Sequence, residues 1–366
     1  METSEMREAM QIMHPHVDIN APLTLYYDET NNIKKLHLKK GNFNVDYTAN
    51  FVLGGFAFSG QKPNVEDIFD GIPLQPNVVE VKLKHIAFGE FTDCLKSQEL
   101  RTFLTNVHAK PLYLHISSLN LLYYSIVDIV DSAIPSSIMH YAPSLKNALY
   151  IACKMSIDAI VPLFVKYTYP NVPKASVKDF VNELVEILEP YKTEKIGGGI
   201  KMLESLLREA ANKDSLPFIT DEDDYILIQG FMQLYARPIY LFLHSDHFFD
   251  NETEIQQLLV DMPLLYKGQK ITNYSFFESK ADKLIQASDV IIGLTGKFFK
   301  YINSSSHDDI LELMFNLLDI QSENLALFLG LIEKSLGFNQ GLIHYIDGHE
   351  ETSKIELLGN LMGKDI

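Results

Sequence analysis

The first third of the chain alternates apolar and polar positions in short runs, a pattern typical of β-strands. Three such runs follow one another, at residues 23–30, 50–59 and 78–86. A stretch with helical spacing comes next, at 94–108, and a fourth strand-like run occupies 111–117. The order of these elements predicts an antiparallel meander, followed by a helix and a further strand.

The rest of the chain is mostly helical in its spacing. Apolar positions recur every three or four residues from 119 to 235, with prolines between the runs. Strand-like sequence resumes at 239–248 and 271–277, and helical spacing returns in 306–366. These changes predict an α/β core interrupted by a large helical insertion. The predicted units are an N-terminal arm at 1–20, a core at 21–118 and 236–305, the insertion at 119–235 and a helical C-terminal extension at 306–366.

The first predicted strand ends in two acids, Asp28 and Glu29. Because side chains alternate along a strand, Asp28 shares a face with Thr24 and Tyr26, and Glu29 lies on the opposite face. A regular strand can turn only one of the two acids into a given site. We favour Asp28 as the site residue, with Glu29 as a supporting or structural group.

A second acidic segment lies far downstream, on a largely apolar predicted helix. A rotation of about 100° per residue places Asp289 on one stripe with Asp282, Gln286, Gly293 and Gly296. A lone carboxylate such as Asp289 is costly to bury unless it has a partner. A metal ion shared with Asp28 would be such a partner.

These two segments resemble, in order, the motifs of the domain-of-unknown-function family 3800. The chain matches them with Asp28-Glu29-Thr30, and with Ser279-Lys280 followed by Gln286, Asp289 and Gly293; it departs at Thr30 and at Ala287-Ser288, and no carboxylate is lost. The resemblance implies a ribonuclease H-like fold. The predicted order of strands and helix agrees with that α/β fold, a mixed sheet carrying the helical insertion and the C-terminal extension.

Asp246 is our candidate for a third carboxylate, because hard divalent cations take several oxygen ligands. It lies at the end of the run from Ile239 to Asp246, within the predicted strand at 239–248 and on the same face as His244. An aspartate that caps the helix predicted at 252–259 is the competing interpretation. A transition-metal site with His247 is disfavoured, because the alternation of side chains turns His247 to the other face. Weaker candidates are His115 and Glu80.

Composition narrows the class of protein. A formal net charge of −17 at pH 7 disfavours simple nucleic-acid binding, unless a divalent metal neutralises the site and the contact face is locally basic. Two such basic patches are Lys82-Lys84-His85 and Lys267-Lys270-Lys280-Lys283, although both could be ordinary solvated faces. Two cysteines make no disulfide framework and no zinc site. Without a signal peptide or a long apolar run, we expect a cytoplasmic protein with no membrane partner.

Two hypotheses follow. In the first, the protein is a phosphodiesterase or nuclease in which Asp28, Asp289 and Asp246 hold Mg²⁺ or Mn²⁺, and Lys82 or Lys280 contacts the scissile phosphate of a nucleic acid or nucleotide. In the second, it is a non-catalytic module that keeps the fold and binds a protein partner through its helical insertion and acidic surface.

Overall fold

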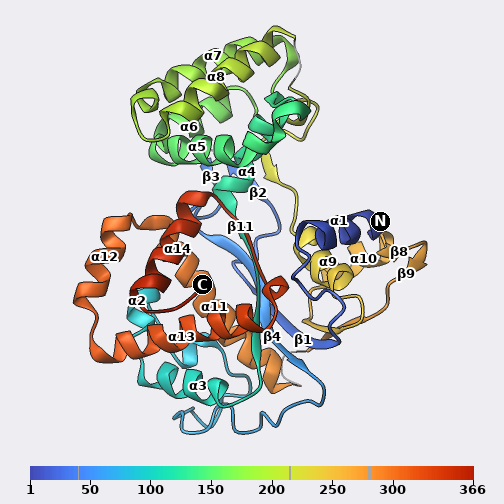
Figure 1. The fold of residues 1–366 in the computed structure, drawn as a ribbon, viewed down its shortest axis with the longest axis vertical. Coiled ribbons are helices and arrows are strands. Elements are labelled where there is room, and N and C mark those ends of the chain that lie inside the picture. Colours follow the sequence, from blue (N-terminus) through green and yellow to red (C-terminus); the bar gives the residue numbers. More distant parts are fainter. Residues whose placement is uncertain (40, 214–215, 279–281) are drawn as a thin grey trace.

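A six-stranded mixed sheet forms the centre of the protein (Figure 1). The structure is a computed structural model that describes residues 1–366 except 40, 214–215 and 279–281. The strands lie in the order β10 (Tyr274–Phe277), β7 (Asp246–Asp250), β1 (Leu23–Thr30), β4 (Asn50–Ser59), β5 (Tyr113–Asn120) and β11 (Ile343–Ile346). The predicted mixed α/β class is therefore confirmed.

The pairing of these strands decides where their ends lie. β4 runs antiparallel to both β1 and β5, so β1 and β5 point the same way. β7 is parallel to β1, β10 is parallel to β7, and β11 is parallel to β5. The carboxyl ends of five strands consequently meet at one edge of the sheet, where polar groups from distant parts of the chain can gather.

One helix, α11 (Lys283–Ser304), packs across β1 and β4 and is buried on most of its circumference. The approach is close because β4 carries glycines: a β carbon on Gly54 would lie 2.2 Å from the carbonyl oxygen of His115 and 2.7 Å from Ile292 Cδ1. The hydroxyl of Ser288 donates to the carbonyl of Tyr26 at 3.3 Å. The predicted apolar helix with a narrow polar stripe is thus the element that covers this face of the sheet.

Further helices complete the core around α11 (Figure 1). They are α2 (Phe91–Cys94), α3 (Gln98–His108), α12 (His307–Asn316), α13 (Asp319–Phe338) and α14 (His349–Leu361). A short 3₁₀ helix, η1 (Leu83–His85), contacts the polar stripe of α11.

A separate group of helices stands above the sheet in Figure 1. It consists of α4 (Leu121–Ala133), α5 (Ala142–Met155), α6 (Ile157–Lys166), α7 (Val177–Leu188) and α8 (Gly197–Asn212), and it has its own apolar core. We call it the helical domain. No single helix in the described chain has the length and apolar composition of a membrane span; one pair, Ser136–Met155 with Ile157–Lys166, bent by 100°, meets both criteria together.

A third group lies on the opposite face of the sheet from α11. It contains α1 (Ser4–Met13), α9 (Met232–Leu241), α10 (Thr253–Asp261) and the hairpin of β8 (Leu265–Tyr266) and β9 (Gln269–Lys270). The predicted arm is therefore a docked helix: the guanidinium of Arg7 donates to the carbonyls of Leu241 and Ile19. A small sheet of β2 (Leu36–Lys39), β3 (Asn42–Phe43) and β6 (Ile226–Ile228) lies near the helical domain.

Two predictions about the strands were wrong, and one strand of the central sheet, β11, was not predicted. Residues 78–86 form no strand, because the side chains of α11 take the place of a neighbouring strand: Val81 N–H donates to Gln286 and Leu83 N–H to Asp289. The third strand of the meander is β5. The strand expected at 239–248 is instead the end of α9 and the beginning of β7, and the C-terminal extension adds β11 to the sheet.

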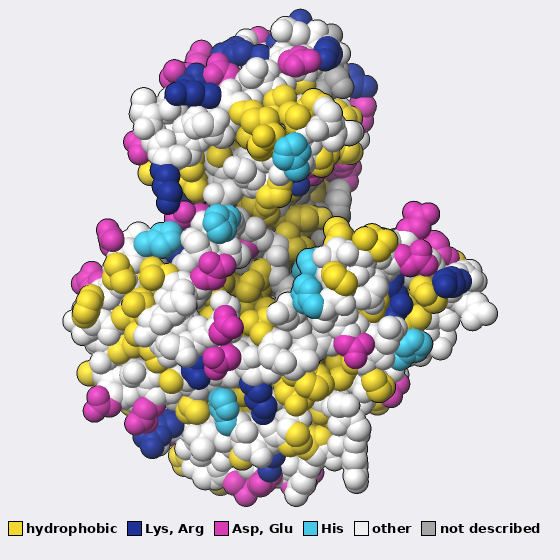
Figure 2. Space-filling view, viewed as in Figure 1, with side chains coloured by type: hydrophobic (Ala, Val, Ile, Leu, Met, Phe, Trp, Pro, Cys, Tyr) yellow, Lys and Arg dark blue, Asp and Glu magenta, His cyan; other side chains and the backbone are white. Residues whose placement is uncertain are grey.

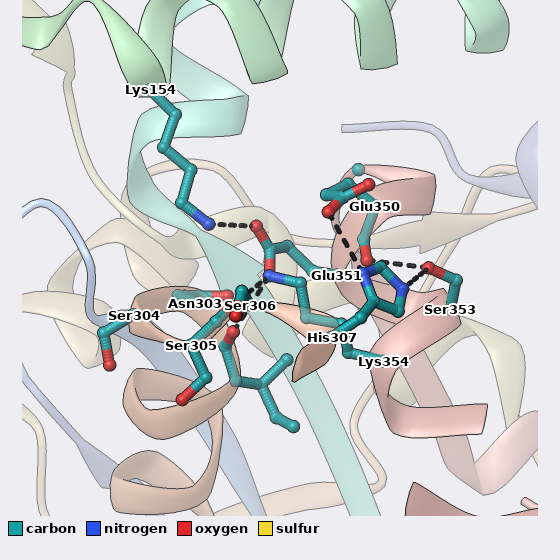
Figure 3. A network of polar contacts seen from close by, with 12 residues as sticks. Lys154, Asn303, Ser304, Ser305, Ser306, His307, Glu350, Glu351, Ser353 and Lys354 are labelled. Carbon is teal, nitrogen blue, oxygen red and sulfur yellow. Dashed lines mark hydrogen bonds and ion pairs between the residues drawn. The ribbon is translucent and has the colours of Figure 1, made fainter. Parts of the chain in front are cut away.

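A buried ionic network joins the helical domain to the core (Figure 3). Glu351 of α14 is fully buried and accepts hydrogen bonds from Lys154 and Tyr150 of α5, at 2.5 and 2.8 Å. Lys354, also buried, donates to Glu351 at 2.6 Å and to the carbonyl of Ser305 at 2.7 Å. Such a network keeps its charges compensated only when both parts are in place, so it fixes α5 against α14.

The close approach of α11 to β4 can be tested at Gly54. Replacing Gly54 by Ala is expected to lower the free energy of unfolding by roughly 1–3 kcal/mol, because the added carbon overlaps backbone and Ile292. The control is Gly198→Ala in α8, where no atom lies within 4 Å of the added carbon; its stability should stay unchanged or rise by up to about 1 kcal/mol. Equal losses in chemical denaturation would contradict the packing argument.

Candidate functional site

Asp28 is the buried centre of an acidic cluster at the carboxyl end of β1. Its side chain is only 7% exposed, and Oδ1 accepts a hydrogen bond from the N–H of Glu29 at 2.8 Å. Burial raises the pKa of Asp28 well above its usual range, and the negative charges of Glu29, Asp289 and Asp250 raise it further. Asp28 is therefore a buried acid whose nearest charged neighbours are mostly other acids.

Asp289 reaches the same place from α11. Its Oδ1 accepts from the N–H of Leu83 at 3.1 Å, and its Oδ2 lies 3.5 Å from Nζ of Lys82. The structure thus places Asp28 and Asp289, predicted to meet, within electrostatic reach of each other. Gly296 permits this proximity, because a β carbon there would lie 2.5 Å from Cγ2 of Thr30, beside the end of β1.

Glu29 forms a second acidic group on the other side of β1. Burial raises its pKa from 4.5 to about 7, assisted by the charges of Glu252 and Asp250, while hydrogen bonds from Tyr235 and Asn32 act in the opposite direction. Asn32 joins Glu29 to Glu252, donating to them at 2.8 and 2.9 Å. At neutral pH, Glu29 is thus poised between its protonated and ionised forms.

Asp246 does not join the cluster, and the structure corrects this prediction. It is the first residue of β7, paired with Thr24 at the far end of β1, and its side chain is exposed. The same strand ends in Asp250, which follows Phe249, the partner of Tyr27. Asp250 shows the signal that identified Asp28, an apolar run ending in an acid; the error lay in starting the strand too early.

The remaining candidates lie apart or beyond the described residues. His115 is buried in β5, next to the ring of Tyr27, and His247 bonds the hydroxyl of Tyr27 at 2.8 Å. Both histidines belong to the packed interior of the sheet face that carries α9. Lys280 lies outside the described residues.

A groove of about 380 Å³ opens beside the acidic cluster. Four lysines line it: Lys82, Lys84, Lys297 and Lys300. Its acids include Glu29 and Asp289, so both signs of charge meet in one groove. On the face that Figure 2 shows, acidic and basic side chains are likewise interspersed.

The carboxylates of the acidic cluster are candidate metal ligands. Carboxylate oxygens suit Mg²⁺ and Mn²⁺, and Asp28 with Asp289 offers two from separate elements. Within the described ranges, however, no three His, Cys, Asp or Glu side chains converge as a metal-binding group. The residues therefore fit an ion held by two carboxylates, with water and substrate oxygens as its other ligands, the usual arrangement for Mg²⁺. The expected cluster of three carboxylates around two ions is not present in that part of the chain.

Comparisons with known proteins add no family. No protein-family model, curated protein sequence or solved structure matches the chain.

The raised pKa of Glu29 predicts a pH dependence of stability. Between pH 4.5 and about 7 the folded protein retains a proton that the unfolded chain has released, so the free energy of unfolding falls as the pH rises through this window. Glu29→Gln should remove the contribution of Glu29 to this slope and stabilise the protein at neutral pH by on the order of 1–3 kcal/mol. Asp28 and Asp347, whose pKa values are also raised, keep their own contributions. Urea denaturation across the window measures both effects. Glu186→Gln, at an exposed position of α7, is the control; an unchanged slope in Glu29→Gln would refute the assignment.

Proposed function

We propose that the protein is a divalent-metal-dependent phosphodiesterase or nuclease that acts on nucleic acid or nucleotide. The observation that carries this proposal is the meeting of Asp28 and Asp289. They come from opposite ends of the chain, and Asp28 is buried among acids beside a groove lined by lysines. Burying ionised acids together is costly unless a proton or a cation neutralises them, and a cation in the groove would favour their ionised forms.

The arrangement of strands supports the same proposal. Three antiparallel strands, β1, β4 and β5, are followed in the chain by β7 and β10, which extend the sheet parallel to β1. This agrees with the ribonuclease H-like fold, with a helical insertion and a C-terminal extension, that the resemblance to family 3800 implies. A fold alone does not imply hydrolysis, so the chemistry rests on the carboxylates.

Asp28 and Asp289 are the residues that would hold the ion. When bound, Mg²⁺ or Mn²⁺ supplies Lewis acidity toward the phosphoryl oxygen and lowers the pKa of a coordinated water. Glu29, with its pKa at about 7, is suited to accept or return a proton near neutral pH. Asp250 contributes negative charge at the end of the neighbouring strand.

Lys82 is the cation placed to contact the phosphate. Its ammonium lies 3.0 Å from Glu80 and 3.5 Å from Asp289, and it lines the groove. In this position it can offset phosphate charge while remaining paired to a site carboxylate. A local concentration of lysines also answers the objection that a chain of net charge −17 repels polyanions.

A non-catalytic protein-interaction module is the second candidate. The observation in its favour is an exposed apolar stripe along α12 and just beyond it: Leu311, Phe315 and Leu318 are 36%, 88% and 56% exposed. Leu311 and Phe315, spaced at i and i+4, lie on one face of α12, and exposed apolar residues with this spacing are typical of a helix face that docks on another protein.

The first test is loss of activity on removing one carboxylate. Asp28→Asn and Asp289→Asn should each reduce Mn²⁺-dependent hydrolysis of labelled DNA, RNA or bis-p-nitrophenyl phosphate by at least about 100-fold. Each change keeps the side-chain shape, so circular dichroism should remain native. Asp246→Asn, at the far end of the sheet, is the matched control and should keep full activity. Undiminished hydrolysis by the Asp28→Asn protein would exclude the proposed mechanism.

The second test measures ion binding without substrate. Mg²⁺ or Mn²⁺ should raise the melting temperature of the wild-type protein with increasing concentration, since an ion at 100 times its Kd stabilises the fold by about 2.7 kcal/mol. Asp289→Asn should abolish this response, and Asp246→Asn should preserve it. A wild-type protein indifferent to both ions would favour the interaction module.

A further inference from the structure

An exposed aromatic side chain lies in the chain segment that contributes one wall of the lysine groove. Phe88 is 80% exposed. Its neighbours in the sequence, Lys84 and Glu90, both line the groove. Isolated exposed apolar residues are common on protein surfaces, so the position of Phe88 matters more than its exposure.

The turn that carries Phe88 is held firmly from several sides. The carbonyl of the next residue, Gly89, accepts a hydrogen bond from Nζ of Lys297 at 2.6 Å. Gly89 itself has φ +88°, and a β carbon there would lie 2.7 Å from Cβ of Asp93. The hydroxyl of Ser97 donates to the carbonyl of Ile86 at 2.6 Å. Because the turn is already fixed, little conformational entropy is lost when its aromatic ring binds a ligand.

Two of the lysines that line the groove are not neutralised by an ion pair within the described residues. Within the described chain, neither Lys84 nor Lys297 forms an ion pair, whereas Lys82 pairs with Glu80 and Lys300 with Asp46 and Glu90. Lys84 is exposed, and Lys297 uses its ammonium only on the carbonyl of Gly89. The turn that carries Phe88 is therefore bonded to Lys297 through Gly89 and follows Lys84 by four residues, and both cations remain available for an anionic ligand.

From this arrangement we infer that the groove binds single-stranded nucleic acid, with a base stacked on Phe88 and the adjacent phosphates on Lys84 and Lys297. Lysines that follow a backbone, combined with an exposed aromatic ring, are the features by which proteins hold single strands without reading their sequence. A duplex keeps its bases stacked inside and offers Phe88 no free base face. The inference names the substrate class of the proposed phosphodiesterase site and rests on that function for its biological purpose.

Binding is measured without metal, so that no cleavage is needed. In EDTA, fluorescence anisotropy of a labelled single strand of roughly 12 nucleotides, as DNA or as RNA, should show weaker binding by Phe88→Ala, about tenfold or more. Phe218→Ala is the matched control, because Phe218 is 52% exposed and does not line the groove, and its affinity should equal that of the wild type. A duplex of the same length should bind more weakly than the single strand.

The contribution of the lysine charges to single-strand binding is measured by the salt dependence of the affinity. Lys84→Ala should reduce the slope of log affinity against log salt by about 0.7, the value for one phosphate contact on a single strand. Lys201→Ala, at an exposed lysine of α8, should leave the slope unchanged. This measurement detects a lost phosphate contact, which mere destabilisation of the turn would not imitate.

The outcomes separate this inference from the proposed function. Phe88-dependent binding in a protein that never hydrolyses phosphodiesters would uphold the inference and reject the phosphodiesterase. Metal-dependent cleavage with binding indifferent to Phe88 and Lys84 would do the reverse. The inference is overturned if the wild type binds no single strand, prefers the duplex, or loses no affinity in Phe88→Ala.

Discussion

The packing of α11 on the centre of the sheet is the constraint on which the candidate site depends. Because β4 has glycines at positions 54 and 55, the helix comes close enough for Ser288 to bond a carbonyl of β1. The same helix carries Asp289 to the end of β1 and, through Gln286, holds the irregular segment that bears Lys82. One helix–sheet contact therefore positions an acid, a cation and one wall of the groove.

The polar groups at the sheet edge continue beyond the site toward the helical domain. Asn31 donates to the carbonyl of Asn50, and the Asn50 and Asn120 side chains both donate to Asp347 at the end of β11. Burial raises the pKa of Asp347 to about 7, with Glu351 adding to the effect. The acidic cluster at Asp28 and the ionic network at Glu351 are thus parts of one continuous polar region, which lies where the carboxyl ends of five strands meet.

The sequence predicted correctly those elements whose buried faces coincide with the spacing of their apolar residues. β1, β4 and α11 were predictable because each buries one or both faces in the way its residue spacing indicates. The segment at 78–86 alternates apolar and polar residues as a strand does. Its backbone N–H groups nevertheless donate to side chains of α11, a long-range contact that the local sequence does not indicate. The proximity of Asp28 and Asp289 was predictable because each is an acid in an apolar element and is costly to bury without a partner. Asp250 was missed because the boundary of β7 depends on its register with β1.

The position of α11, β7 and β11 late in the chain has a consequence for biosynthesis. β1 and β4 leave the ribosome early, but the strand that lies on the other side of β1 begins only at Asp246, and the helix that covers both strands begins at Lys283. Until then a nascent hairpin carries an open edge and an uncovered apolar face, which are hazards for aggregation. The helical domain has a core of its own, so it can fold before the remaining strands of the sheet have been synthesised. The central sheet can therefore be completed only after β11, which begins at Ile343, has been synthesised.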